Sequence, residues 1–402
     1  MTTGLQRYTF DRMELAGSLG DLGTLLPLAI GMILVNKLDP AGLFFSVGLY
    51  YILAGIYFGV TVPVQPMKVV GAYAIAMGLS ASQIMAASLW LGGIFIIIGA
   101  TGAMDLIGRY TPKPVVRGVQ LSTGALLMAE GVKFMLGTSK FQLMSKAAEP
   151  FLTVQHVGFV PVGIIIGALG GLLTLLLLDN RKLPAGLLVV CGGAAVGLIL
   201  GTHQGFEHMR LGLHLPPLLP FPFPNVADFG SALLILVLPQ IPMTLGNAVI
   251  AYADLSNDYF GEASHRVTYR GACISIAIAN FVGYLFGGMP LCHGAGGLAA
   301  HHRFGARTAG SNLMIGAFFL LLVVFFGDRI LAVLYLLPMS ILGVLLIFAG
   351  GQLALTIIDL KDRKGLFVAL MMLGITLASN LAAGFLAGLV IAYLLKSERL
   401  NV

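Results

Sequence analysis

The sequence predicts an all-α polytopic membrane protein, and three observations support this fold class. Of its 402 residues, 58% are hydrophobic and only 10% are charged, a balance that soluble domains do not have. Apolar stretches long enough to span a membrane, bounded by charges, proline and glycine, follow one another along the chain. Two of these stretches are interrupted by proline and polar residues, which predicts two broken half-helices.

We expect fourteen transmembrane segments in two sets of seven. The first set is predicted at residues 15–35, 41–60, 62–79, 82–104, 114–135, 158–178 and 183–202. The second set is predicted at residues 228–252, 268–288, 289–302, 308–327, 330–355, 366–378 and 381–395. Because each set has an odd number of segments, residues 228–402 should form an inverted repeat of residues 1–202. Residues 203–227, a loop rich in His and Pro, join the two repeats.

The basic residues indicate how the chain lies in the membrane. Sixteen of the 23 Lys and Arg residues fall on the side of both termini, six fall on the other side, and Lys68 lies within a segment. The positive-inside rule therefore predicts cytoplasmic termini. The first apolar stretch is too long for a cleavable signal peptide. We expect a multi-pass protein of the cell membrane, in a bacterium the inner membrane, with lipid around it and no nucleic-acid partner.

The third segment contains the first break, at Pro66. Proline lacks an N–H group and disfavours helix at the preceding residue, so we predict a helix over residues 67–78. About 12 residues span roughly 18 Å, less than the hydrocarbon core of about 30 Å. The helix should therefore begin near mid-membrane, where free N–H groups, the helix dipole, Met67 and Lys68 form an anion site. Gln65 either adds amide donors to this site or caps the broken backbone.

The tenth segment, with the sequence MPLCHGAGGLAAHH, mirrors the third. Pro290 precedes about 12 residues of predicted helix, and the segment runs in the opposite direction, so the two helix N-termini should meet. Cys292, His293, Gly294 and Ala295 would line this second helix start, with His293 as a hydrogen-bond donor or a proton carrier. The Cys–His pair lacks a second pair of ligands one turn away, so we expect no metal and no cofactor.

Two further segments should contribute polar side chains to the same cavity. Asp21 and Thr24 lie in GSLGDLGTLLPL of the first segment. A carboxylate within a membrane is costly, so Asp21 either pairs with a lysine as a structural group or shapes the site and couples protons. Gln240, Thr244 and Asn247 share one face of the eighth segment at i, i+4 and i+7. They either bind substrate or hydrogen-bond to neighbouring helices.

Three motifs resemble a known family. ELAGSLGDLGTLLPL at 14–28, VPVQPMK at 62–68 and MPLCHGAGGLAAHHRFGAR at 289–307 are similar to the signature segments of the molybdate transporter family first known from plants and algae. That family is a branch of the sulfate permease superfamily. Matched by position, the family's motifs contain these residues of this sequence: Asp21 in GDLG, Gln65 and Lys68 in PVQPMK, and Cys292 and His293 in CHGAGG.

The resemblance implies seven plus seven inverted helices, divided into two domains. The core domain would comprise residues 15–104 plus 228–328, and the gate domain residues 105–202 plus 329–396. An oxyanion would bind at the facing N-termini of segments three and ten, and homodimers would form through the gate domain. The chain stops soon after segment fourteen, so we expect no cytoplasmic STAS domain, unlike in typical sulfate permeases.

These inferences predict a transporter and not an enzyme, because no paired acid and base, nucleophile–base pair or two-metal set appears. We expect secondary active import of molybdate by alternating access, coupled to protons or another cation, with Asp21 and His293 as coupling candidates. Sulfate and other oxyanions stay open as substrates. A nucleobase carrier would need carboxylates on segments eight and ten to bind ring N–H groups. Segment eight offers the amides Gln240 and Asn247 instead, and segment ten offers no acid. An anion channel with the broken helices as its filter is a further alternative.

Overall fold

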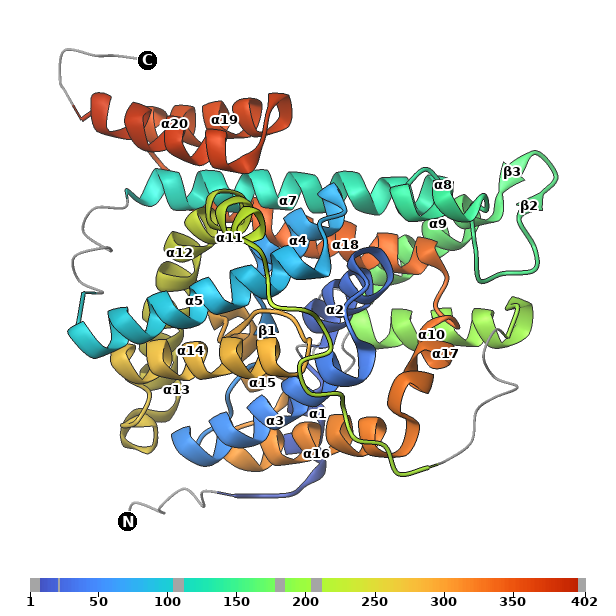
Figure 1. The fold of residues 1–402 in the computed structure, drawn as a ribbon, viewed down its shortest axis with the longest axis horizontal. Helices are drawn as coiled ribbons and strands as arrows, with labels where there is room; N and C mark the ends of the chain where they lie inside the picture. The colour runs from blue at the N-terminus through green and yellow to red at the C-terminus, as the bar shows by residue number, and fades with distance from the viewer. Residues whose placement is uncertain (1–7, 21, 104–111, 178–184, 204–211, 397–402) are drawn as a thin grey trace.

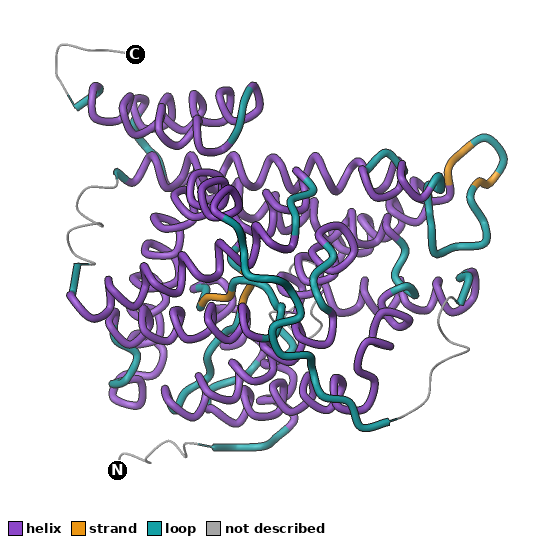
Figure 2. Tube along the Cα trace, viewed as in Figure 1, coloured by secondary structure: helices purple, strands orange, loops and turns teal. Residues whose placement is uncertain are grey.

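The computed structural model describes residues 8–20, 22–103, 112–177, 185–203 and 212–396. This part of the chain folds into a helical bundle with two antiparallel pairings of very short strands (Figures 1 and 2). Up to the loop between the predicted repeats, the elements are α1 Arg12–Ser18, α2 Leu22–Asn36, α3 Pro40–Phe58, β1 Gln65–Pro66, α4 Lys68–Met77, α5 Ala81–Thr101, α7 Lys113–Leu136, α8 Lys140–Ser145, β2 His156–Val157, β3 Val160–Pro161, α9 Val162–Leu177 and α10 Ala185–Leu200.

The second part of the chain begins with a long, continuous helical run and ends with two antiparallel helices. Its elements are α11 Val226–Ala232, η2 Leu233–Val237, α12 Leu238–Met243, η3 Thr244–Ile250, α13 Ala251–Phe260, η4 Gly261–Ser264, α14 Tyr269–Leu285, β4 Leu291–Cys292, α15 Ala295–Phe304, α16 Ala309–Phe326, η5 Gly327–Arg329, α17 Ile330–Leu334, α18 Met339–Ala354, η6 Leu355–Asp359, α19 Arg363–Ala378 and α20 Leu381–Leu394.

Each predicted segment contains helix, but two that were expected to be continuous are divided. The first segment consists of α1 and α2, and the twelfth consists of α17 and α18, with Pro338 as the N-cap of α18. Within the described part of the chain, five helical runs are long and apolar enough to cross a membrane: Pro40–Phe58, Ala81–Thr101, Val226–Ser264, Ala309–Phe326 and Met339–Asp359. The count of fourteen spans and the repeat layout stay predictions.

The helices α4 and α15 are the two short helices that the prolines predict. Each has ten residues, about 15 Å, or half the thickness of a hydrocarbon core. The predicted start of α4 is one residue early, because Met67 is the N-cap and has extended backbone. Both helices end at a glycine with positive φ, Gly78 at +61° and Gly305 at +115°.

The extended stretches before α4 and α15 cross and pair with each other. Gln65 of β1 lies opposite Cys292 of β4 in an antiparallel register. The Met67 N–H donates to the Pro290 carbonyl at 2.9 Å. Buried backbone outside helices needs partners of this kind, because no water reaches it. The pairing therefore allows both helices to begin inside the bundle.

Two asparagine side chains satisfy more of this extended backbone. Asn312 of α16 accepts from the Val62 N–H and donates to the Val62 carbonyl, both at 2.8 Å. Asn280 of α14 donates to the Leu291 carbonyl at 3.0 Å. Asn312 thus supports the stretch before α4, and Asn280 supports the stretch before α15. In both cases an amide side chain of a neighbouring helix hydrogen-bonds to the extended backbone.

Long helices pack in pairs around this centre. The helix α7 lies along α18 and α19, α5 along α14, and α3 along α16. Figure 1 shows α7 crossing the upper part of the view with α19 and α20 above it. The described part of the loop between the repeats lies against the ends of α14 and α16, where Leu219 N–H donates to Leu285 and His214 N–H to Val324. The division into core and gate domains stays a prediction.

Candidate functional site

A cavity of about 350 Å³ lies beside the N-termini of both short helices. Lys68 projects from the first turn of α4, and Gly296 lies in the first turn of α15. Thr24 from α2 and Asn247 from η3 complete this side of the cavity, which we call the Lys68 cavity. The structure thus brings together three residues that the sequence predicts for the site, Thr24, Lys68 and Asn247.

The charge of the Lys68 cavity favours an anion. Among the described residues that line it, Lys68 carries the only formal charge and no Asp or Glu is present. The described residues also provide no hydrogen-bond or ion-pair partner for the Lys68 ammonium. Asp21 lies outside the described residues, so its predicted roles stay predictions.

The N-terminus of α15 adds to this positive potential. Its N-cap is Gly294, which has no side chain, and no described side chain accepts from the N–H groups of Ala295 or Gly296. Gly296 is exposed where it reaches the cavity, and Ala295 beside it is partly exposed. Uncapped N–H groups at the positive end of a helix dipole bind anions well.

The N-terminus of α4 differs from the prediction. The Val69 and Val70 N–H groups, which were expected to be free, donate to Oε1 of Gln240 at 3.0 and 3.2 Å. The Gln240 Nε2 amide in turn donates to the Thr244 hydroxyl at 2.8 Å. Both side chains are buried and neither lines the Lys68 cavity. Gln240 and Thr244 therefore cap α4 in this structure, and their predicted contact with substrate stays a prediction.

His293 is fully buried where the extended stretches cross. Its Nδ1 lies 2.9 Å from the Pro63 carbonyl, which can only accept, so Nδ1 carries a proton. Its Nε2 lies 2.6 Å from the Tyr50 hydroxyl and 3.0 Å from the Ser275 hydroxyl, and it accepts a hydrogen bond in the neutral ring. His293 thus ties β4 to the stretch before β1. It does not line the Lys68 cavity, and its predicted role in coupling stays a prediction.

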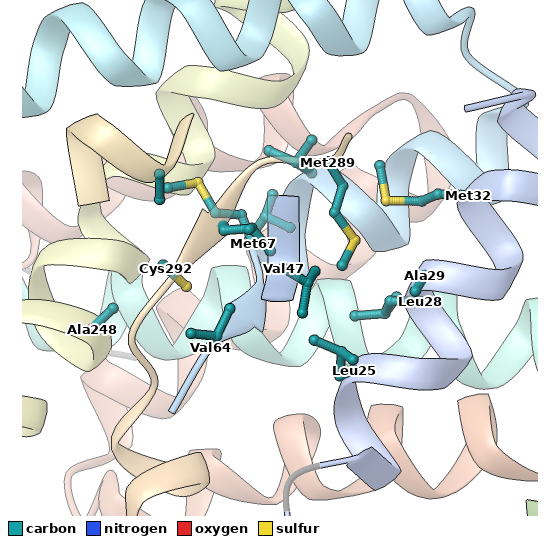
Figure 3. Packing of buried hydrophobic residues seen from close by; sticks show 14 of the residues in the cluster. Leu25, Leu28, Ala29, Met32, Val47, Val64, Met67, Ala248, Met289 and Cys292 are labelled. Atoms are coloured by element: carbon teal, nitrogen blue, oxygen red, sulfur yellow. The ribbon is translucent and has the colours of Figure 1, made fainter. Parts of the chain in front are cut away.

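The other predicted residues of the crossing lie behind the cavity. Gln65 is buried, and a Cβ atom at Gly294 would lie 1.8 Å from its Oε1, so a larger residue there would displace the Gln65 side chain. Figure 3 shows Met67 and Cys292 in a cluster of apolar side chains with Val64, and both are buried there. These residues fix the position of the two helix starts.

Two prolines precede the turn that carries Asn247. The long run from α11 to η4 contains wide π-helical turns, and η3 follows Pro239 and Pro242 of α12. Proline lacks the N–H that a helix turn uses, and π turns occur often at functional sites. The wide turn of η3 carries Asn247 to the wall of the cavity.

The opposite wall of the Lys68 cavity was not predicted from the sequence. Four polar residues line it: Gln120 of α7, Thr174 of α9, Gln352 of α18 and Thr356 of η6. The sequence feature that could have identified these four residues is an amide or hydroxyl side chain within an apolar segment. That signal is weak, because such residues equally serve as hydrogen-bond partners between helices.

Comparisons with known proteins identify the family and support the fold. A profile of the family described as "Molybdate transporter of MFS superfamily" matches residues 13–127 and 232–353. Molybdate transporter 2 of Arabidopsis thaliana is 32% identical, over 96% of this chain and 88% of that protein. Molybdate transporter 1 of Chlamydomonas reinhardtii is also 32% identical, over 94% of this chain and 90% of that protein.

A solved structure supports the fold. The transmembrane domain of a cyanobacterium bicarbonate transporter, BicA, superimposes with a TM-score of 0.67 at 15% identity, over 95% of this chain and 97% of that domain. The resemblance seen in the three sequence motifs is confirmed, as is the expectation of a transporter rather than an enzyme. With a family profile covering more than half of its residues and relatives at 32% identity over almost its whole length, the chain belongs to this family of molybdate transporters.

Proposed function

We propose that this protein is a secondary active transporter that imports molybdate by alternating access, with the Lys68 cavity as its binding site. The observation that carries the proposal is the composition of that cavity. It joins Lys68 to the uncapped N-terminus of α15, and no acidic residue is among its described lining residues. Family membership supports molybdate as the substrate.

A tetrahedral dianion matches the donors that the cavity offers. The Lys68 ammonium supplies one positive charge, and a helix N-terminus acts as roughly half a charge. Amide and hydroxyl groups of Thr24, Gln120, Asn247 and Gln352 surround the remaining space and can donate to oxygens. Sulfate has the same shape and charge, so selection between the two anions would depend on size and hydrogen-bond geometry.

Import of a dianion requires energy. An inside-negative potential opposes entry by roughly 2.3 kcal/mol per charge for each 100 mV. Two co-transported protons would cancel this opposition, and more than two, or an equivalent charge of another cation, would let the potential drive uptake. We propose Asp21, outside the described residues, and His293 as candidates for proton coupling.

We further propose the architecture in which this transport takes place. Fourteen spans would form two inverted repeats in the cell membrane, with cytoplasmic termini and homodimers formed through the gate domain. The antiparallel crossing of β1 and β4 supports the inverted relation, because α4 and α15 begin on opposite sides of one point. The core domain would carry the anion as it moves against the gate domain.

Binding of molybdate to the purified protein in detergent tests the site. We expect Lys68→Gln to weaken binding at least about tenfold, because it removes a charge from the cavity. The matched control is Lys37→Gln, since Lys37 is exposed and its ammonium lies over the Phe141 ring at 5.1 Å, outside the cavity. This control should bind as the wild type does.

Two results would contradict the proposed site. Equal binding by Lys68→Gln and the wild type would remove Lys68 from the site. Failure of the wild type to bind either molybdate or sulfate would contradict the oxyanion assignment, and nucleobase binding and anion currents would then be measured. Adding sulfate as a competitor for molybdate binding measures the selectivity of the site. We expect sulfate to compete weakly if the protein is a molybdate carrier.

A further inference from the structure

A second, wider cavity of about 580 Å³ adjoins the Lys68 cavity. The two cavities share three lining residues, Gln120, Asn247 and Thr356. Beyond them, the wider cavity extends to Lys113 and Arg117, in the first turns of α7. The distribution of basic residues predicts that this end of α7 is cytoplasmic. We call the space bounded by Arg117, Gln120 and Asn247 the Arg117 cavity.

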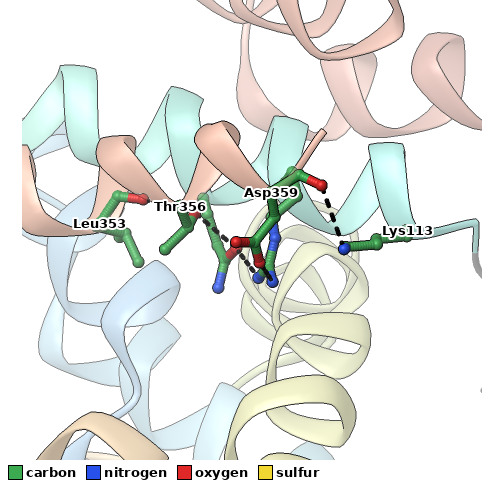
Figure 4. Close-up of polar contacts among 6 residues, drawn as sticks. Lys113, Leu353, Thr356 and Asp359 are labelled. Carbon is green, nitrogen blue, oxygen red and sulfur yellow. Dashed lines mark hydrogen bonds and ion pairs between the residues drawn. The ribbon is translucent and has the colours of Figure 1, made fainter. Parts of the chain in front are cut away.

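The Arg117 cavity has an excess of positive charge. Arg117 forms an ion pair with Asp359, whose side chain is 50% exposed and does not line the cavity. Lys113 donates from Nζ to the Asp359 backbone carbonyl at 3.3 Å (Figure 4). The Asp359 carboxylate pairs with Arg117, whereas Lys113 contacts only the backbone carbonyl, and no Asp or Glu is among the described lining residues. The Nε atom of Arg117 is buried and has no hydrogen-bond partner among the described residues.

The Gln120 side chain is held in one orientation. Arg117 donates from Nη1 to its Oε1 at 2.8 Å, and the Thr356 hydroxyl lies 2.9 Å from the same oxygen. Because a guanidinium can only donate, the atom that it contacts must be the amide oxygen. The Nε2 group of Gln120 therefore points away from Arg117. The described residues provide no acceptor for this Nε2 group, although only 3% of the Gln120 surface is exposed.

Asn247 faces Gln120 from another element. It lies in the π turn η3 and lines both cavities, and the described part of the chain gives its amide no partner. A dianion that left Lys68 would lose its hydrogen-bond donors. If the path ahead were apolar, the anion would be desolvated without replacement, which is costly for a charged group. Two amides and a guanidinium along the path would replace those donors one after another.

We propose that the Arg117 cavity is a second oxyanion site, which takes a tetrahedral dianion between the Lys68 cavity and the end of the bundle that carries Lys113. Arg117 and Lys113 supply the charge, and Gln120 and Asn247 supply the directed N–H donors. The inference rests on the proposed function, because it assigns a second position to the same substrate. It adds residues of α7 to a site that the sequence placed on other segments.

Equilibrium binding of radioactive molybdate to the purified full-length protein tests the second site. We expect a tight and a weak phase in the wild type. Arg117→Gln should weaken the weak phase about tenfold and the tight phase much less, since Arg117 lines only the wider cavity and reaches the Lys68 cavity only through its contact with Gln120. Lys68→Gln is its matched counterpart, since it also removes one positive charge, and it should remove the tight phase and keep the weak one. Gln120→Met, which keeps length but removes the amide donors, should weaken both phases, because Gln120 lines both cavities.

The possible results separate the two claims. A single phase in the wild type that Lys68→Gln removes would overturn the second site and leave the proposed function standing. Absence of any molybdate binding by the wild type would overturn both. Equal weak-phase affinities for Arg117→Gln and the wild type would also overturn the second site. If Arg117→Gln does not fold, Lys113→Gln replaces it, because Lys113 contacts only a backbone carbonyl in Figure 4 and its loss is expected to weaken the same phase.

Discussion

Gln240 contacts the N-terminus of α4 through one oxygen, which accepts from two consecutive N–H groups. This contact gives two of the first N–H groups of α4 an acceptor within the buried bundle. In the proposed site, the anion donors would then be Lys68 and the start of α15, not the Val69 and Val70 N–H groups. At the scale of single residues, the capping of α4 and the proposed anion binding are therefore assigned to different groups.

Two substitutions at Gln240 should separate these tasks. Gln240→Leu leaves the Val69 and Val70 N–H groups without an acceptor, at a cost of about 1–3 kcal/mol for each group. We expect a lower midpoint of thermal unfolding in detergent. Gln240→Glu keeps an acceptor at the same place, so the midpoint should stay close to that of the wild type. Its carboxylate lies near the anion site, however, and molybdate should bind at least about tenfold more weakly. A wild-type midpoint for Gln240→Leu would contradict the capping role.

The extended stretches are the elements that determine where α4 and α15 begin. The strands β1 and β4 satisfy part of each other's backbone, and Asn312 and Asn280 satisfy more of it from neighbouring helices. The buried neutral ring of His293 links the same two stretches. These contacts hold the two helix starts in a fixed relation, so the proposed anion site would depend on groups that do not line it.

Asn312→Leu tests this support at the scale of the element. It removes the partners of the Val62 N–H and carbonyl groups, so the protein should unfold at a markedly lower temperature and express poorly. The control is Asn247→Leu, at a cavity wall where the described residues offer the amide no partner. This variant should keep the wild-type midpoint and lose affinity for molybdate. Equal midpoints for Asn312→Leu and the wild type, measured under the same conditions, would show that the stretch does not need the asparagine.

At the scale of the whole molecule, the cavity lies between elements that are far apart in the sequence. Prolines and glycines determine local backbone, so the sequence alone predicts α4, α15 and the meeting of their N-termini. It also predicts Lys68, Thr24 and Asn247 as cavity residues. The cap formed by Gln240 and the wall formed by Gln120, Gln352 and Thr356 depend on how α7 and α18 pack against the rest. A polar residue in an apolar segment does not reveal which neighbour it will face.

The cavity's position between packed elements also agrees with alternating access. Lys68, Thr24 and Asn247 come from segments assigned to the predicted core domain, whereas Gln120 and Gln352 come from segments assigned to the predicted gate domain. Movement of one group against the other would therefore form and break the donor set around the anion. A channel, in contrast, would keep one set of donors along a permanent path.

Uptake of radioactive molybdate into vesicles that contain the purified protein tests the central claim most directly. With an inward gradient of protons or of another cation, wild-type vesicles should accumulate molybdate above its outside concentration. Lys68→Gln vesicles should not accumulate it, while Lys37→Gln vesicles should match the wild type. Molybdate flux that only follows the membrane potential, or accumulation by Lys68→Gln at the wild-type level, would contradict a coupled carrier with its anion site at Lys68.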